Sequence, residues 1–159
     1  MSPVIEADVS AAKRTALRCL ERRAFARSDL ARRLRRKAHL PEAVEAALDR
    51  VAELGLLNDA EFAVNFVRSR AARGRGPSRL RRDLQVVGVA PGLIEQALAV
   101  QWPEGTDGRE MIQTLVRRRG AQLGGALPRQ TRRRRVLAYL ARRGFQGQVA
   151  REVVRTLIA

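Results

Sequence analysis

The sequence predicts an all-α fold of three tandem three-helix, helix-turn-helix-like repeats in an elongated, curved array. The first observation is self-similarity, because a set of six positions recurs with an offset of fifty residues and a looser third copy follows. The positions are Leu30, Leu34, Pro41, Val44, Ala47 and Leu48, then Leu80, Leu84, Pro91, Ile94, Ala97 and Leu98, and more loosely Val136, Leu140, Gly144, Phe145, Val149, Val153 and Val154. The second is that apolar residues fall at three- and four-residue spacing, whereas strand patterns are almost absent. Such a period is typical of units that bury their apolar sides against their neighbours.

The first repeat is expected at residues 11–57, after a flexible tail over residues 1–10. Its first helix carries Ala16, Leu17 and Leu20 at helical spacing. Ser28 is the expected N-cap of the second helix, and Pro41 suits the first turn of the third, where a missing N–H costs nothing.

The second repeat is expected at residues 58–106. Asn58 and Glu61 form a capping-box pattern at its entrance, in which side chains and backbone satisfy each other's polar groups. The opening helix is expected to bury Phe62, Ala63, Phe66 and Val67. Pro77 and Pro91 suit the first turns of its second and third helices.

The third repeat is expected at residues 107–159, after a hinge at residues 105–108. Met111, Ile112, Leu115 and Val116 repeat the spacing of the second repeat's opening helix. Pro128 suits the start of the next helix.

The charge of the chain points to a polyanionic partner. There are 32 basic and 16 acidic side chains, which gives a formal net charge of +16, and only Lys13 and Lys37 are lysines. GC-rich coding accounts for arginine in place of lysine, but not for the shortage of acidic residues. A pI near 11.8 is typical of proteins that bind nucleic acid or nucleoprotein.

The remaining composition bears on compartment and chemistry. Cys19 is the only cysteine, so no internal disulfide can form, and a cytoplasmic location is expected. Neither a signal peptide nor a membrane span is expected. His39, the only histidine, is interpreted as a helix-terminal residue touching the last carbonyls. We therefore expect no enzyme activity, no metal and no cofactor.

Arginine clusters are the stronger candidate for a functional site. Acidic partners at four-residue spacing are scarce along them, and the run 132–135 lies close to the positive end of a helix dipole, where an anionic partner would relieve the repulsion. The predicted binding residues are Arg32, Arg33, Arg35, Arg36, Lys37, Arg70, Arg73, Arg75, Arg79, Arg81, Arg82, Arg117, Arg118, Arg132, Arg133, Arg134, Arg135, Arg142 and Arg143.

The residues alone leave three classes of nucleic-acid-binding protein open. A helix-turn-helix transcription regulator would read one duplex sequence through a single recognition helix. A ribosome- or RNA-associated protein is a second alternative. The spread of arginines over all the repeats suits a long electrostatic track better, and the few aromatics fall at core positions and leave little for base stacking.

The central segment resembles the RecX family of regulatory proteins. The resemblance rests on the stretch from Gly55 to Ala63, on the turn from Arg73 to Leu84, and on Gly88 with Val89, and it extends over nearly the whole chain beyond residue 10. Asn58 replaces the first aspartate of the family's usual pair, and Ala38-His39 stands where a glycine–aromatic pair is common. The motif residues are Gly55, Asn58, Asp59, Phe62, Gly74, Gly76, Pro77, Leu80, Leu84 and Gly88.

The resemblance implies a non-enzymatic modulator of the RecA recombinase, built as three tandem three-helix repeats. Such proteins lie in the groove of the RecA–single-stranded DNA filament and mainly restrain its ATP hydrolysis, strand exchange and co-protease action, in homologous recombination, DNA repair and the SOS response. Single-stranded DNA is the expected nucleic-acid partner, with double-stranded DNA as a further one. The protein is expected to be a monomer.

Overall fold

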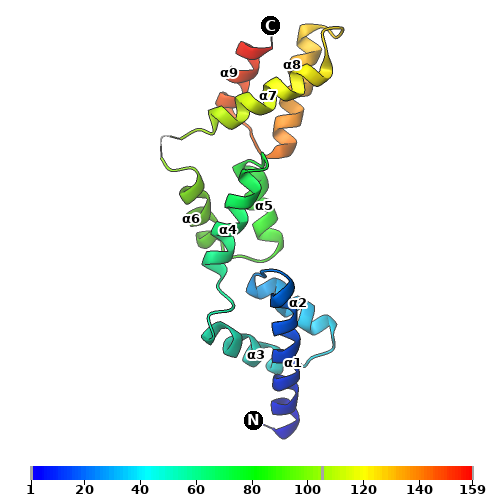
Figure 1. Cartoon of the computed structure of the whole chain (residues 1–159), viewed down its shortest axis with the longest axis vertical. Helices are drawn as coiled ribbons and strands as arrows, with labels where there is room; N and C mark the ends of the chain where they lie inside the picture. Colours follow the sequence, from blue (N-terminus) through cyan, green and yellow to red (C-terminus); the bar gives the residue numbers. More distant parts are fainter. Residues whose placement is uncertain (1, 105, 159) are drawn as a thin grey trace. The chain divides into compact units, whose positions relative to one another are not determined.

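The computed structural model describes residues 2–104 and 106–158, and over these residues it contains nine helices and no strand (Figure 1). The helices are α1 (Pro3–Arg22), α2 (Arg27–Arg36), α3 (Pro41–Glu53), α4 (Asp59–Ala71), α5 (Pro77–Val86), α6 (Pro91–Gln101), α7 (Arg109–Leu123), α8 (Arg129–Arg143) and α9 (Gln148–Leu157). The all-α prediction is confirmed for the described part of the chain. The curved arrangement and the repeat boundaries stay predictions. Met1, Gly105 and Ala159, which fall in the predicted tail, hinge and last repeat, lie outside the described residues.

The chain divides into two compact units. One is Met1–Asn65 with Leu84–Ile94, and the other is Phe66–Asp83 with Glu95–Ala159. The first therefore holds α1 to α3 complete and the second holds α7 to α9 complete, while α4, α5 and α6 each contribute residues to both.

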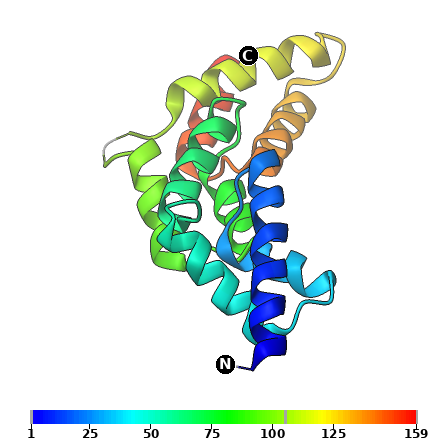
Figure 2. The same cartoon turned by 60° about the horizontal axis from the view of Figure 1, so that its bottom comes forward.

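In the first unit, α1 packs along α3, as both views of the ribbon show (Figures 1 and 2). The seam between them is made of small side chains, with Val9 and Ala12 of α1 fully buried against Ala43 and Ala47 of α3. A second buried cluster contains Leu30, Leu34, Val44 and Leu48, which are four of the six positions in the first copy of the internal repeat. Its members are Ala16, Cys19, Phe25, Leu30, Ala31, Leu34, Val44, Leu48, Val51 and Leu57.

The prediction of a flexible tail over residues 1–10 is wrong for residues 3–10, which are helical. Pro3 occupies the first turn of α1, and Val9 is fully buried. Glu6 accepts a hydrogen bond from the Arg50 guanidinium at 2.9 Å, and Asp8 Oδ2 accepts one from the Leu40 N–H at 2.7 Å. These contacts with α3 and the segment before it hold the first turns of α1 in place.

Of the two predicted N-caps, at α4 and α2, the structure confirms the first and contradicts the second. Asn58 Oδ1 accepts the Glu61 N–H at 3.1 Å, so the predicted cap of α4 is confirmed. Ser28, however, is not the N-cap of α2, because that helix begins at Arg27 and Ala26 occupies the cap position. The cap is instead supplied from far along the chain, since Asp59 Oδ1 accepts the Arg27 N–H at 2.8 Å.

Burial along α4 and α5 agrees with the sequence in part. Leu80 and Leu84 of α5 and Ala63 and Val67 of α4 are fully buried, whereas Phe62 and Phe66 are only half-buried. The Arg70 guanidinium lies over the Phe66 ring, with its central carbon 3.6 Å from the ring centroid.

In the second unit, α7, α8 and α9 enclose a core that includes Ile112, Leu115, Val116, Val136, Leu140, Phe145, Val153 and Val154. The turn before α5 is joined to the end of α8 by backbone hydrogen bonds. The Gly76 N–H donates to the Arg143 carbonyl at 2.6 Å, and the Ser78 N–H donates to the Gly144 carbonyl at 3.3 Å. A Cβ atom on Gly76 would lie 2.5 Å from the Gly144 oxygen, so only glycine allows this approach.

Candidate nucleic-acid interface

In the first unit the predicted binding residues lie at the end of α2, and they differ in their partners. Arg32 pairs with Asp29 at 3.3 Å and donates to the Val86 carbonyl at 3.0 Å, while Arg35 pairs with Glu45 at 2.8 Å. Arg36 and Lys37 are exposed, and no ion pair joins either of them to a carboxylate among the described residues. The free cations of this helix are therefore concentrated at its last turn.

The α5 arginines are largely neutralised by local acids. Asp83 pairs with Arg75 at 2.9 Å and with Arg79 at 3.0 Å. Arg81 grips Glu95 through Nε at 2.6 Å and Nη2 at 3.1 Å. The hydrogen bonds from Arg81 lower the pKa of the Glu95 carboxyl below its ordinary value, so this pair stays charged at neutral pH.

Two exposed cations remain beside this group. Arg73 and Arg82 are exposed, and within residues 2–104 and 106–158 neither forms an ion pair with a carboxylate. Arg70 is half-buried against the Phe66 ring. The sequence does not distinguish the arginines between Arg70 and Arg82. The structure does, because some of them pair with a carboxylate whereas Arg73 and Arg82 do not among the described residues.

In the second unit, two of the predicted residues have structural partners. Arg133 Nε donates to the Ile158 carbonyl at 2.9 Å and Nη2 donates to the Arg155 carbonyl at 2.8 Å, so Arg133 caps the end of α9. Arg143 Nη1 donates to the Arg73 carbonyl at 3.0 Å. Both guanidinium groups hold the fold together through backbone oxygens.

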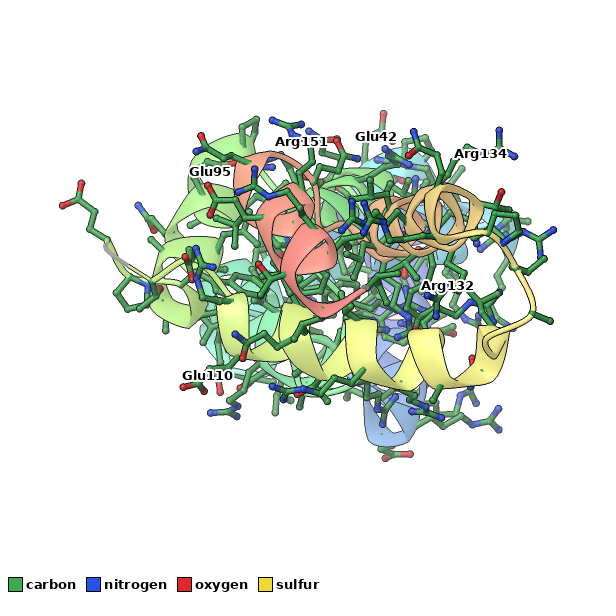
Figure 3. The ribbon with its side chains drawn as sticks, turned by 90° about the horizontal axis from the view of Figure 1, so that it is seen from above. Glu42, Glu95, Glu110, Arg132, Arg134 and Arg151 are labelled. Atoms are coloured by element: carbon green, nitrogen blue, oxygen red, sulfur yellow. The ribbon has the colours of Figure 1, made fainter. Side chains whose placement is uncertain are left out.

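The other predicted arginines of this unit are more accessible. Arg117 and Arg118 on α7, Arg134 and Arg135 on α8, and Arg142 near the end of α8 are exposed, and Arg132 is half-buried. Figure 3 shows Arg134 and Arg151 extending on one side of this unit, with Glu110 of α7 at the opposite edge.

A cavity of about 550 Å³ lies between α8 and α9. Its lining brings together Arg133 and Arg134 from α8 with Arg151 and Arg155 from α9, and it contains no acidic residue. The complete lining is Gln130, Thr131, Arg133, Arg134, Leu137, Arg151, Val154 and Arg155. Arg133 is already bonded to backbone carbonyls, but Arg134, Arg151 and Arg155 around this acid-free lining are suited to a phosphate-bearing ligand.

The sequence analysis did not include Arg151 and Arg155, which line this cavity, among the candidate binding residues. It also left out Arg18 and Arg22 of α1, which line another basic cavity in the first unit. In each pair the two arginines are four residues apart on one helix, which places them on the same face. That spacing was the available signal. These residues stand outside the long arginine runs, since Arg18, Arg151 and Arg155 are single and Arg22 has only Arg23 beside it.

Histidine, cysteine and acidic side chains are the remaining candidates for chemistry. No group of three or more His, Cys, Asp and Glu side chains is arranged to hold a metal ion in the part of the chain the structure describes. His39 follows the end of α2, and its backbone N–H donates to the Leu34 carbonyl at 3.4 Å, as expected of a helix-terminal residue. Its side chain has a different partner, because Nδ1 lies 2.6 Å from Asp8 Oδ1. Cys19 is buried. Among the described helices, none is both long and apolar enough to cross a bilayer.

Comparison with known proteins adds a family. Two family models match the chain, described as RecX, second three-helix domain, over residues 58–98, and RecX, third three-helix domain, over residues 107–154. A regulatory protein RecX from Pseudomonas savastanoi pv. phaseolicola is 40% identical over 144 residues, which cover 90% of this chain and 89% of the relative. The crystal structure of RecX from Lactobacillus salivarius has a TM-score of 0.80 at 20% identity and covers 96% of this chain and 97% of its own. A second crystal structure, of a regulatory protein RecX, has a TM-score of 0.81 at 23% identity, and the match covers 96% of this chain and 74% of the other chain. The tandem three-helix organisation predicted from the internal repeat is thereby confirmed.

Proposed function

The chain belongs to the RecX family of regulatory proteins, and from that premise we propose that it binds RecA–single-stranded DNA filaments in the cytoplasm and mainly inhibits them. The proposed effects are slower RecA ATP hydrolysis, less strand exchange and less co-protease action. The protein acts without an active site of its own. Binding to the filament changes the balance between filament states, and no covalent step is needed.

The observation that carries the proposal is a set of exposed cations that form no ion pair with an acidic side chain among the described residues. Several helices contribute to this set: Arg36 and Lys37 lie at the end of α2, Arg82 lies on α5, Arg117 and Arg118 on α7, and Arg134 and Arg135 on α8. Clustered positive charges without acidic partners repel one another, and a polyanion offsets that repulsion. A basic surface on repeated modules suits a long helical nucleoprotein.

Aromatic side chains give further support. Autonomous single-strand binders stack bases on exposed aromatics. Here Phe25 and Phe145 are buried, and Phe62 and Trp102 are half-buried. Phe66 is covered by Arg70, and Tyr139 has Arg143 and Arg119 near its ring at 5.1 Å and 5.6 Å. The surface is therefore better suited to phosphates held by an existing filament than to unstacked bases.

The direct test is the DNA-dependent ATPase of RecA, measured with and without this protein at sub-stoichiometric ratios. The proposal expects the rate to fall, and to recover as salt rises because phosphate contacts are screened. An unchanged ATPase rate together with sequence-specific duplex binding would favour a helix-turn-helix transcription regulator. Co-sedimentation with ribosomes and no effect on RecA would favour the RNA-associated alternative.

A further inference from the structure

A second basic cavity lies in the first unit, between α1 and α2, which pack against each other there (Figure 1). Its volume is about 380 Å³, and its lining is Thr15, Arg18, Cys19, Arg22, Arg23, Phe25, Arg33 and Lys37. Five of these eight residues are cationic and none is acidic. Only Arg33 and Lys37 belong to the binding residues predicted from the sequence.

The cations are contributed by two helices in matched pairs. Arg18 and Arg22 are four residues apart on α1, and Arg33 and Lys37 are four residues apart at the end of α2. Each pair therefore projects from one face of its helix, and both faces line the same cavity. Cys19 and Phe25, which are buried, form the apolar part of the cavity lining.

The local partners of these cations leave most of the charge unbalanced. Arg23 pairs with Asp29 at 3.2 Å and lies over the Phe25 ring at 3.6 Å, and Arg18 donates only to Thr15 Oγ1 at 3.3 Å. Over the part of the chain that the structure describes, no ion pair joins Arg18, Arg22, Arg33 or Lys37 to a carboxylate.

Arg33 carries an unsatisfied donor beside the cavity, as Arg119 does elsewhere in the chain. Its Nε is buried and has no hydrogen-bond acceptor among the described residues. A buried donor without an acceptor carries a desolvation penalty, so native proteins rarely leave one unsatisfied. The negative end of a helix dipole accounts for cations in the last turns of α1 and α2, but neither for Arg18, one turn earlier, nor for this unsatisfied donor.

We propose that this cavity binds phosphate groups, supplied by successive phosphates of a nucleic-acid strand. The two helical pairs would hold neighbouring phosphate oxygens. The site extends the proposed function, from which it takes nucleic acid as the phosphate source, by placing a phosphate contact on α1. A free polyphosphate offers the same chemistry, and the experiment separates the two sources.

The test uses the single cysteine as a local reporter. Cys19 lines the cavity and is 8% exposed, so a bound phosphate ligand should slow its alkylation by iodoacetamide. The variant R22Q/K37Q removes one arginine and one lysine from the lining, and K13Q/R14Q removes the same residue types from α1 outside it. R22K/K37R keeps both charges.

Oligothymidylate is expected to slow the alkylation of Cys19 at least several-fold in the wild-type protein, in K13Q/R14Q and in R22K/K37R, but not in R22Q/K37Q. In fluorescence anisotropy with the same oligonucleotide, R22Q/K37Q should reduce the slope of log affinity against log salt by about 1.4, because each lost single-strand phosphate contact removes about 0.7.

Equal losses in R22Q/K37Q and K13Q/R14Q would overturn the proposal, because net charge alone would then explain binding. Protection by pyrophosphate but not by oligothymidylate would keep a phosphate site and overturn the nucleic-acid source. Absence of protection by either probe would overturn the site itself. Failure of the proposed function is a separate result, because it would appear as an unchanged RecA ATPase while Cys19 is still protected.

Discussion

Arg133 and Ile158 are joined across twenty-five residues of sequence by a hydrogen bond of 2.9 Å from the guanidinium Nε to the backbone carbonyl. The same side chain also holds the Arg155 carbonyl at 2.8 Å. The last carbonyls of a helix have no partner within the helix and carry partial negative charge. Arg133 therefore closes the end of α9, whereas the neighbouring Arg134 is exposed on α8.

Reversing the charge of Arg133 and of Arg134 should affect different properties of the protein, the first its stability and the second its binding to DNA. Arg133→Glu removes two hydrogen bonds from a charged donor and places a carboxylate beside carbonyl oxygens, so the free energy of unfolding should fall by about 2–3 kcal/mol. Arg134→Glu should leave stability within about 0.5 kcal/mol and weaken binding to single-stranded DNA. Urea denaturation and fluorescence anisotropy measure the two effects. Equal loss of stability in both variants would contradict the separation of roles.

The contact between Asp8 and His39 should make the first unit sensitive to acid. Hydrogen bonds from the His39 ring and from the Leu40 N–H lower the pKa of Asp8 below its ordinary value. A carboxyl with a lowered pKa in the folded state stabilises the protein above its unfolded pKa, and that contribution is lost as the pH falls through about 4 and below. Asp8→Asn should therefore be less stable at neutral pH and should lose less further stability on acidification.

The measurement is the urea midpoint as a function of pH for the wild type and Asp8→Asn. Glu53→Gln is the matched control, because Glu53 is exposed on α3 and forms no ion pair within residues 2–104 and 106–158. Parallel pH profiles for wild type and Asp8→Asn would show that the contact does not contribute.

Ala38 has a φ of 65°, the one positive value at a non-glycine position among the described residues. The position fifty residues later is Gly88, with a φ of 82°. A side chain in this region costs about 1–2 kcal/mol, so Ala38→Gly should stabilise the protein by about 1 kcal/mol once the greater freedom of glycine in the unfolded chain is included. Thermal denaturation measures the change.

Gly88→Ala is the reciprocal substitution and should destabilise by more than Ala38→Gly stabilises. Besides the positive φ, its new Cβ atom would lie 2.6 Å from the Ser28 Cβ. A loss of stability in Ala38→Gly would contradict the interpretation of Ala38 as strained.

Local features of the fold were predictable because their causes are local. The fifty-residue offset and the helical spacing identified buried positions such as Leu30 and Leu80, and Asn58 caps the helix that follows it. The failures have distant causes. Asp59 caps α2 from thirty-two residues away, and residues 3–10 are helical because Val9 meets Ala43 and Ala47.

The candidate site was predictable in composition but not in detail. Runs of arginine identified α2, α5 and α8. A run does not reveal which of its members pair with a carboxylate, as Arg79 and Arg81 of α5 do with Asp83 and Glu95, or donate to a backbone carbonyl, as Arg133 of α8 does. The acid-free cavities depend on pairs such as Arg18 with Arg33, which meet only when two helices pack. Sequence patterns give the charge of a surface, and packing decides which charges remain available.

The turn at Gly76 offers the sharpest test of the second unit. Gly76→Ala would place a Cβ atom 2.5 Å from the Gly144 oxygen and 2.9 Å from Phe145 Cδ1, while the Gly76 N–H bonds the Arg143 carbonyl at 2.6 Å. Because backbone cannot yield as a flexible side chain can, the free energy of unfolding should fall by at least about 2 kcal/mol. Gly92→Ala is the control, since a Cβ atom there meets nothing within 4 Å and alanine favours the α6 helix by up to about 1 kcal/mol. If urea denaturation showed Gly76→Ala to be as stable as Gly92→Ala, the close packing of this turn against the end of α8 would be refuted.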